Sequence, residues 1–207
     1  MSKTLHIEAS PRGSDSGSSQ LAAWFLSAYR EKNPDELIET LNVFEVDLPP
    51  VNADAIHAKF APIFNEEVSD AQRATWRDVE AQIAFFDSFD KIVLSSPMWN
   101  YSIPYPLKHY FDIIMQPRLT FGYNSETMEH IGLLRNRPVQ LLLTRSSVPP
   151  GDYSDFQLPY LRFVFGAMGL RDIRVILAWH TTQPTAEARA EYLESFNSEC
   201  TANGSAF

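Results

Sequence analysis

The apolar positions of this chain form two kinds of segment that alternate along its length. Short continuous apolar runs, such as 91–96, are typical of strands buried on both faces of a sheet. Longer segments repeat apolar positions every three to four residues, as Trp76, Val79 and Ile83 do, which is typical of a helix with one buried face. The pattern predicts strands near 3–9, 36–44, 91–96, 138–145 and 172–179, and helices near 19–32, 66–87, 105–115, 154–168 and 185–198.

Five strand–helix units in succession predict an α/β fold, an open parallel sheet with helices on both faces. No internal repeat or low-complexity linker divides the sequence, so we expect one domain over residues 1–207. Two stretches interrupt the alternation. Residues 46–65 carry three prolines and little periodicity, and residues 117–137 predict a hairpin or a loop that covers a pocket.

Composition narrows the class of protein. The net charge of −9 argues against a nucleic-acid partner, because phosphates would repel the chain. Cys200 is the only cysteine, which rules out an intramolecular disulfide and fits a reducing cytoplasm. The sequence shows no signal peptide and no apolar run of membrane-spanning length, so we expect a cytoplasmic protein without a membrane partner. The five histidines do not cluster at metal-ligand spacing, so we expect no metal site.

A hydroxyl-rich loop at 10–20 joins the first predicted strand to the first predicted helix. Gly13 and Gly17 let its backbone turn closely, and its serines add hydroxyl donors. The helix start adds unpaired N–H groups and the positive end of its dipole. We interpret the loop as a phosphate site with mainly neutral donors, since Arg12 is its one basic residue. The alternative is a flexible turn in which Ser18 caps the helix.

Two further loops, 95–104 and 143–151, follow predicted strands in the same way. Ligands of open α/β sheets bind beyond the carboxyl ends of the strands, so all three loops are expected at one site. The first carries Met98 and Trp99, which suit a flat ring system. The alternative is a turn whose aromatic residues fill the core. For Arg145 in the second loop, binding of a carboxylate and a place on the surface both remain open.

These loops resemble those of the FMN-dependent NADH:azoreductases, relatives of the NAD(P)H:quinone oxidoreductases. The resemblance implies a flavodoxin-like fold, a five-stranded parallel sheet of strand order 2-1-3-4-5 between helices. It covers most of the chain except 45–65 and the last few residues. It rests on the serine loop at 10–20, on 96–104 followed by 107–112, on 119–123, and on 159–169.

The resemblance implies an FMN site, NADH or NADPH as electron donor, a quinone or azo compound as acceptor, and a homodimer. It implies a ping-pong hydride mechanism that needs no catalytic side chain, because water can supply protons. A backbone N–H of the 98–101 turn is the expected donor to the flavin carbonyl that gains negative charge. The implied contacts are Ser10, Ser16, Gly17 and Ser18 for the phosphate, Met98, Trp99, Asn100 and Tyr101 for the ring edge, and Thr144, Arg145, Ser146 and Ser147 for the pyrimidine side.

The chain departs from the family pattern at two places. Ser146 and Ser147 stand where the family typically has a pair of glycines, and Trp99 stands where it usually has tyrosine. Two other functions remain open. One is a flavodoxin-type electron carrier without enzymatic activity, and the other is a flavin-free binding module that shares the fold.

Overall fold

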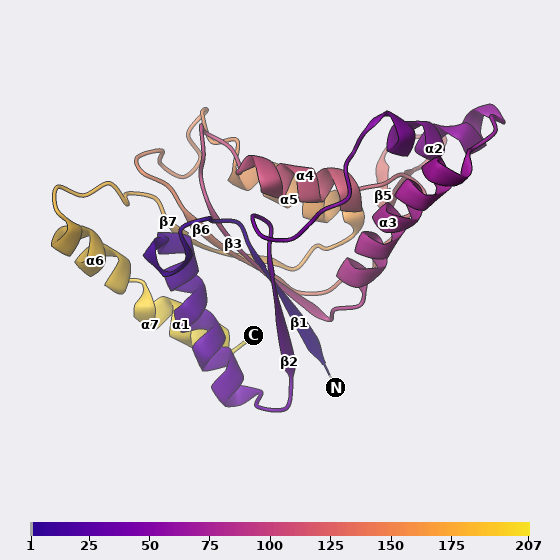
Figure 1. Ribbon diagram of the computed structural model, residues 1–207. Coiled ribbons are helices and arrows are strands. Elements are labelled where there is room, and N and C mark those ends of the chain that lie inside the picture. The colour runs from indigo at the N-terminus through magenta and orange to yellow at the C-terminus, as the bar shows by residue number, and fades with distance from the viewer. Residues whose placement is uncertain (1) are drawn as a thin grey trace.

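A parallel five-stranded sheet forms the centre of the computed structural model, which describes residues 2–207 (Figure 1). The strands lie in the order β2-β1-β3-β6-β7, which confirms the predicted flavodoxin-like order once the sheet strands are numbered along the chain. Each is short and pairs in parallel with its neighbours. The sheet strands are β1 (Lys3–Glu8), β2 (Leu37–Asn42), β3 (Lys91–Pro97), β6 (Val139–Thr144) and β7 (Ile173–Ala178).

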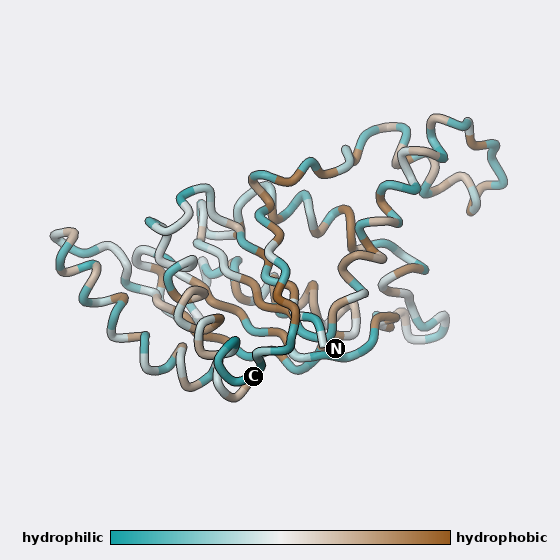
Figure 2. Tube along the Cα trace, turned by 60° about the horizontal axis from the view of Figure 1, so that its bottom comes forward, coloured by the Kyte–Doolittle hydropathy of each residue, from teal (hydrophilic) through white to brown (hydrophobic). Residues whose placement is uncertain are grey.

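Helices cover both faces of this sheet, and the most apolar stretches of the chain run between the two helical layers (Figure 2). One apolar cluster joins the sheet to α3 (Asp70–Asp87), α4 (Tyr105–Ile114) and α5 (Leu158–Met168). A second cluster, on the other face, joins it to α1 (Gly17–Lys32), α6 (Ala186–Glu194) and α7 (Asn197–Ser205). Cys200 lies fully buried in this second cluster, where burial raises the pKa of its thiol to about 12.

Three expectations about the elements need correction or completion. The stretch 46–65 contains a helix, α2 (Ala53–Phe64), capped by the side chain of Asn52 and packed on α3; Pro62 in its last turn hides it from a periodicity search. The helix expected near 154–168 begins only at Leu158. The helix expected near 185–198 is two helices, α6 and α7, separated by 195–196.

The interruption at 117–137 is a hairpin, one of the two expected forms. It consists of β4 (Phe121–Tyr123) and β5 (His130–Gly132), which pair antiparallel. Gly132 lies against the end of α5, where an added Cβ would meet backbone atoms of Gly169 at 2.2 Å. Gly169 itself ends α5 with φ +106°, a conformation that favours glycine. These two glycines let the hairpin dock directly onto the helix.

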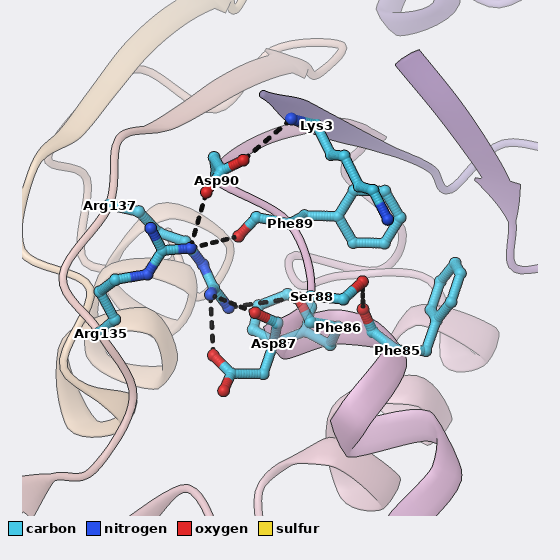
Figure 3. A network of polar contacts seen from close by, with 9 residues as sticks. All are labelled: Lys3, Phe85, Phe86, Asp87, Ser88, Phe89, Asp90, Arg135 and Arg137. Carbon is cyan, nitrogen blue, oxygen red and sulfur yellow. Dashed lines mark hydrogen bonds and ion pairs between the residues drawn. The ribbon is translucent and has the colours of Figure 1, made fainter. Parts of the chain in front are cut away.

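Two arginines from the segment before β6 hold the C-terminus of α3 and the residues that follow it (Figure 3). Arg137 is almost fully buried and donates from Nη1 to the carbonyl of Asp87 at 3.1 Å and from Nη2 to that of Phe86 at 3.2 Å. Its Nη1 also lies 2.8 Å from the Asp87 carboxylate, and its guanidinium lies over the Phe86 ring. Arg135 makes the corresponding contact with Asp90, but it is largely exposed. This network lies at the amino ends of the strands.

No helix in residues 2–207 is both long and apolar enough to cross a membrane.

His6 in β1 is a buried titratable group within the sheet. Its Nε2 lies 2.9 Å from Oγ of Ser95, and burial, aided by the charge of Arg30, lowers its pKa to about 4. The unfolded chain therefore binds a proton near pH 6.5 that the folded chain accepts only near pH 4, so stability falls as pH drops through that window. We expect a loss of about 3 kcal/mol in the free energy of unfolding across it.

Urea unfolding at several pH values measures this loss, with His6→Gln as the reference. The variant should lack this part of the pH dependence, although its stability at pH 7 can also change. Parallel curves for the two proteins between pH 6.5 and 4 would rule out His6 as the source.

Candidate functional site

A cleft of about 410 Å³ lies at the carboxyl ends of β1, β3, β6 and β7. Its size falls within the range of about 300–1,000 Å³ that small-molecule sites usually have. All three loops singled out from the sequence border it, as does the loop after β7. The lining residues are Ser10, Pro11, Arg12, Ser16, Gly17, Pro97, Met98, Trp99, Thr144, Arg145, Ser146, Thr181, Thr182, Gln183 and Arg189.

One end of the cleft is the N-terminus of α1. Ser16 is the N-cap residue, but its side chain does not cap the helix; its Oγ lies 3.0 Å from Oγ of Ser18. The first intrahelical bond runs from Gln20 N–H to the Ser16 carbonyl. The N–H groups of the three preceding residues therefore have no partner among the described residues. Unpaired donors at the positive end of a helix dipole favour an anion.

Two arginines add positive charge to this end. Arg12 comes from the serine loop and is exposed. Arg189 comes from α6, and its Nη2 would lie 3.4 Å from a Cβ at Gly17. The anion site therefore combines neutral donors with two positive charges. The sequence interpretation, which expected mainly neutral donors, missed Arg189. The polar run 180–183 follows the fifth sheet strand, whose carboxyl end lies at the same edge of the sheet as the other loops. This run is the sequence signal that could have placed the next helix, and with it Arg189, beside the cleft.

The other end of the cleft is bordered by a tight turn after β3. Trp99 and Ser102 exchange backbone hydrogen bonds of 2.9 Å in both directions. Asn100 and Tyr101, the central residues, have φ values of 44° and 70°, which is uncommon outside glycine. The N–H of Met98 donates to the Thr144 carbonyl at 2.7 Å. Since the N–H groups of Met98 and Trp99 already have partners, the predicted donor to the flavin carbonyl is the N–H of Asn100 or of Tyr101.

Trp99 also belongs to a group of three aromatic rings, which we call the aromatic trio: Phe44, Trp99 and Tyr105. Their ring centroids lie 5.5 Å, 6.1 Å and 6.5 Å apart in pairs. Tyr105 is 74% exposed, and a hollow of about 220 Å³ lies beside it and Phe44. The trio therefore extends the apolar wall of the cleft toward solvent.

Comparisons of the sequence and of the structure with known proteins point to the same family. The chain matches the flavodoxin-like fold family over residues 2–199. It is 41% identical over 202 residues to the FMN-dependent NADH:quinone oxidoreductase of Nitratidesulfovibrio vulgaris strain DP4, covering 94% of this chain and 96% of the relative. The chain belongs to the family of FMN-dependent NADH:quinone oxidoreductases. The FMN-dependent NADH:quinone oxidoreductase 1 of Bradyrhizobium diazoefficiens is 34% identical, covering 89% of each chain.

A solved structure of the same fold superimposes closely. It is the FMN-dependent NADH-azoreductase from Bacillus anthracis strain Ames Ancestor in complex with FMN, 25% identical, with a TM-score of 0.85 and coverage of 99% of this chain and 98% of that one. The family resemblance read from the sequence is therefore confirmed.

The structure brings most of the residues implied by the family resemblance to the cleft. Those that line it are Ser10, Ser16, Gly17, Met98, Trp99, Thr144, Arg145 and Ser146. The others lie next to it without lining it: Ser18, Asn100, Tyr101 and Ser147. Ser18 is buried behind Ser16 and does not cap the helix, whereas the remaining three are exposed.

Arg145 takes neither of its two open roles, because its side chain is buried against a carboxylate of its own chain. Its side chain is 0% exposed, and Nη1 lies 2.7 Å from Oδ2 of Asp155, whose side chain is 2% exposed. The approach is too oblique for a hydrogen bond. Because the side chain has no exposed surface, its backbone rather than its guanidinium borders the cleft.

Proposed function

We propose that this chain is an FMN-dependent oxidoreductase that transfers electrons from NADH to quinones or azo compounds. The observation that carries the proposal is the cleft itself, which joins a helix N-terminus, whose first three N–H groups have no partner among the described residues, to a wall that contains Met98 and Trp99. The prediction of an enzyme with FMN as cofactor is confirmed by the family, whose members are named for both. The ping-pong order and the identity of the acceptor are proposals.

The residues of the cleft fit FMN. Ser10 and Ser16 would hold the phosphate together with the N–H groups that begin at Gly17, and Arg12 and Arg189 would balance its charge. Met98 and Trp99 would border the ring, and Thr144 and Ser146 would contact its polar edge. A bound FMN supplies two-electron chemistry, accepting hydride from a nicotinamide and delivering it to an acceptor.

The protein's own contribution is geometry and a dry surface. With a flat reactant stacked in the cleft, the rings of the aromatic trio would shield that side of it from water. Donor and acceptor are both flat and would occupy this one place in turn, which gives a ping-pong order. The N–H groups of Asn100 and Tyr101, which have no partner in the described part of the chain, would stabilise negative charge that develops on a ring carbonyl.

We also propose that the chain forms a homodimer. Exposed apolar side chains are concentrated on α2 and on the hairpin, and contiguous patches of this kind usually mark interfaces. Light scattering should give twice the 23.5 kDa mass of one chain, and a single-chain mass at micromolar concentration would contradict it. The exposed residues are Ile56, Phe60, Ile63 and Phe64 on α2, and Tyr123, Met128, Ile131 and Leu133 on and around the hairpin.

The aromatic trio makes a prediction about acceptors. Removing the exposed ring with Tyr105→Ala should raise KM for a two-ring quinone or azo dye about three- to tenfold, because an offset aromatic contact contributes about 0.5–1.5 kcal/mol. The kcat should not change, and Tyr105→Phe should behave like the parent. Steady-state kinetics with a two-ring acceptor and with benzoquinone check this, since a single ring need not reach Tyr105. Equal losses for both acceptors would contradict it.

A visible spectrum and NADH oxidation test the function as a whole. The purified protein should be yellow, or become so with added FMN, and should oxidise NADH when a quinone is present. A flavin-bound protein that does not oxidise NADH would favour an electron carrier. A colourless protein that FMN does not restore would favour a flavin-free binding module. NADPH, tested in parallel, decides the donor preference, and the expected cytoplasmic location stays a prediction.

A further inference from the structure

The loop after β6 and the start of α5 meet at the buried Arg145–Asp155 ion pair. Removing two charges from water costs several kcal/mol per ion, so such a pair persists only where its surroundings hold it. The carboxylate is held: Asp155 Oδ1 accepts from the N–H of Gln157 at 3.1 Å and of Leu158 at 3.2 Å. Gln157 is the N-cap residue of α5 and Leu158 its first residue, so the helix N-terminus further stabilises the negative charge.

The arginine side of the pair is fixed to the edge strand. The N–H of Arg145 donates to the Ala178 carbonyl at 3.0 Å. The carbonyl of Arg145 accepts from Thr181 twice, from its N–H at 3.1 Å and from its Oγ1 at 3.0 Å. Thr181 lines the cleft. The backbone of Arg145 is therefore held to the loop after β7 independently of its guanidinium.

The aspartate side of the pair reaches the turn after β3. The N–H of Phe156 donates to the Tyr101 carbonyl at 3.0 Å, and Nε2 of Gln157 donates to the Ser96 carbonyl at 3.3 Å. Segment 155–157 thus contacts the turn that carries Trp99 on one side and Arg145 on the other. The charge pair therefore closes the connection between β6 and α5, and segment 155–157 ties that connection to β3 and the turn after it.

We propose that Arg145 and Asp155 are positioning residues that set the spacing between the turn after β3 and the loop after β6, which would border the FMN ring. The proposal rests on the proposed function. The phosphate end is built separately, from α1 and α6, and does not depend on the pair. Loss of the pair should therefore weaken binding of the ring but not of the phosphate.

Asp155→Asn tests this, because asparagine keeps the shape and can still accept a bond from the α5 N-terminus. In the apoprotein, we expect the FMN Kd to rise at least tenfold, while the Kd of inorganic phosphate changes less than twofold. The visible circular dichroism of bound FMN should also change, since the ring would be held differently. Asp152→Asn is the matched control, because among the described residues the side chain of Asp152 bonds only to Ser154, and the substitution leaves the backbone unchanged; all three readouts should stay unchanged.

Gln157→Met carries the test if Asp155→Asn does not fold. It keeps the volume and the backbone donor but removes the bond to the Ser96 carbonyl, and should raise the FMN Kd about threefold with phosphate unchanged. A lower melting temperature with an unchanged FMN Kd and dichroism would overturn the proposal, as would equal weakening of FMN and phosphate. Failure of the parent protein to bind FMN would instead overturn the proposed function.

Discussion

Replacing Ser16 with aspartate should weaken FMN binding strongly while making the apoprotein more stable. The Ser16 side chain makes no capping bond, so a carboxylate there gains the free N–H groups and the positive end of the α1 dipole. We expect about 1 kcal/mol of added stability, or a rise of about 2–4 °C in Tm. The same carboxylate would occupy the phosphate's donors and repel its charge, which should raise the FMN Kd by about 10²- to 10³-fold.

Riboflavin, which lacks the phosphate, separates this effect from general damage to the cleft. Its affinity should be nearly the same for Ser16→Asp and the parent, as measured by quenching of flavin fluorescence. Ser14→Asp places the same charge on the exposed part of the serine loop, outside the cleft lining, and serves as the matched variant. Undiminished FMN binding by Ser16→Asp would mean that the phosphate lies elsewhere.

Replacing Arg137 with methionine should lower the free energy of unfolding much more than replacing its exposed neighbour Arg135. The substitution removes hydrogen bonds from a buried cation to two carbonyls of α3 and its contact with the Phe86 ring (Figure 3). Charge-assisted bonds contribute about 1.5–3 kcal/mol each and a desolvated cation–π contact about 2 kcal/mol, against which the desolvation of the arginine must be set. We expect a net loss of about 4 kcal/mol in the free energy of unfolding.

Arg135→Met provides the comparison, since Arg135 contacts Asp90 in the same network but is largely exposed. It should cost less than about 1 kcal/mol, as exposed ion pairs usually do. Denaturant unfolding followed by circular dichroism measures both variants. FMN affinity of folded Arg137→Met should equal that of the parent, because the network lies at the opposite end of the sheet from the cleft. Similar losses for the two arginines would contradict the role assigned to burial.

The fold could be predicted from the sequence because parallel strands buried on both faces leave continuous apolar runs. The same logic located three of the loops that border the cleft, since the carboxyl ends of parallel strands share one edge. It did not find Arg189, which lies on a helix more than a hundred residues after the serine loop and reaches the site only through the position of β7 at the sheet edge.

The direction of the Arg145 side chain could not be predicted from the sequence either. A basic residue in a polar loop suggests contact with a ligand, and only the fold shows that Asp155 lies beneath it. The α2 helix was missed for a local reason, because Pro62 and several alanines obscure its periodicity while tertiary packing on α3 supports it. Sequence patterns thus specify buried strands well and long-range side-chain pairs poorly.

The buried Cys200 is a natural reporter of local opening between two helices. Because the thiolate is the reactive form, a buried thiol of raised pKa should react with an alkylating reagent only when α7 separates from α1. The rate of labelling by iodoacetamide then reports how often these two helices open, without any engineered probe. Since α1 also carries the anion site, added FMN should slow that rate, whereas riboflavin should slow it less.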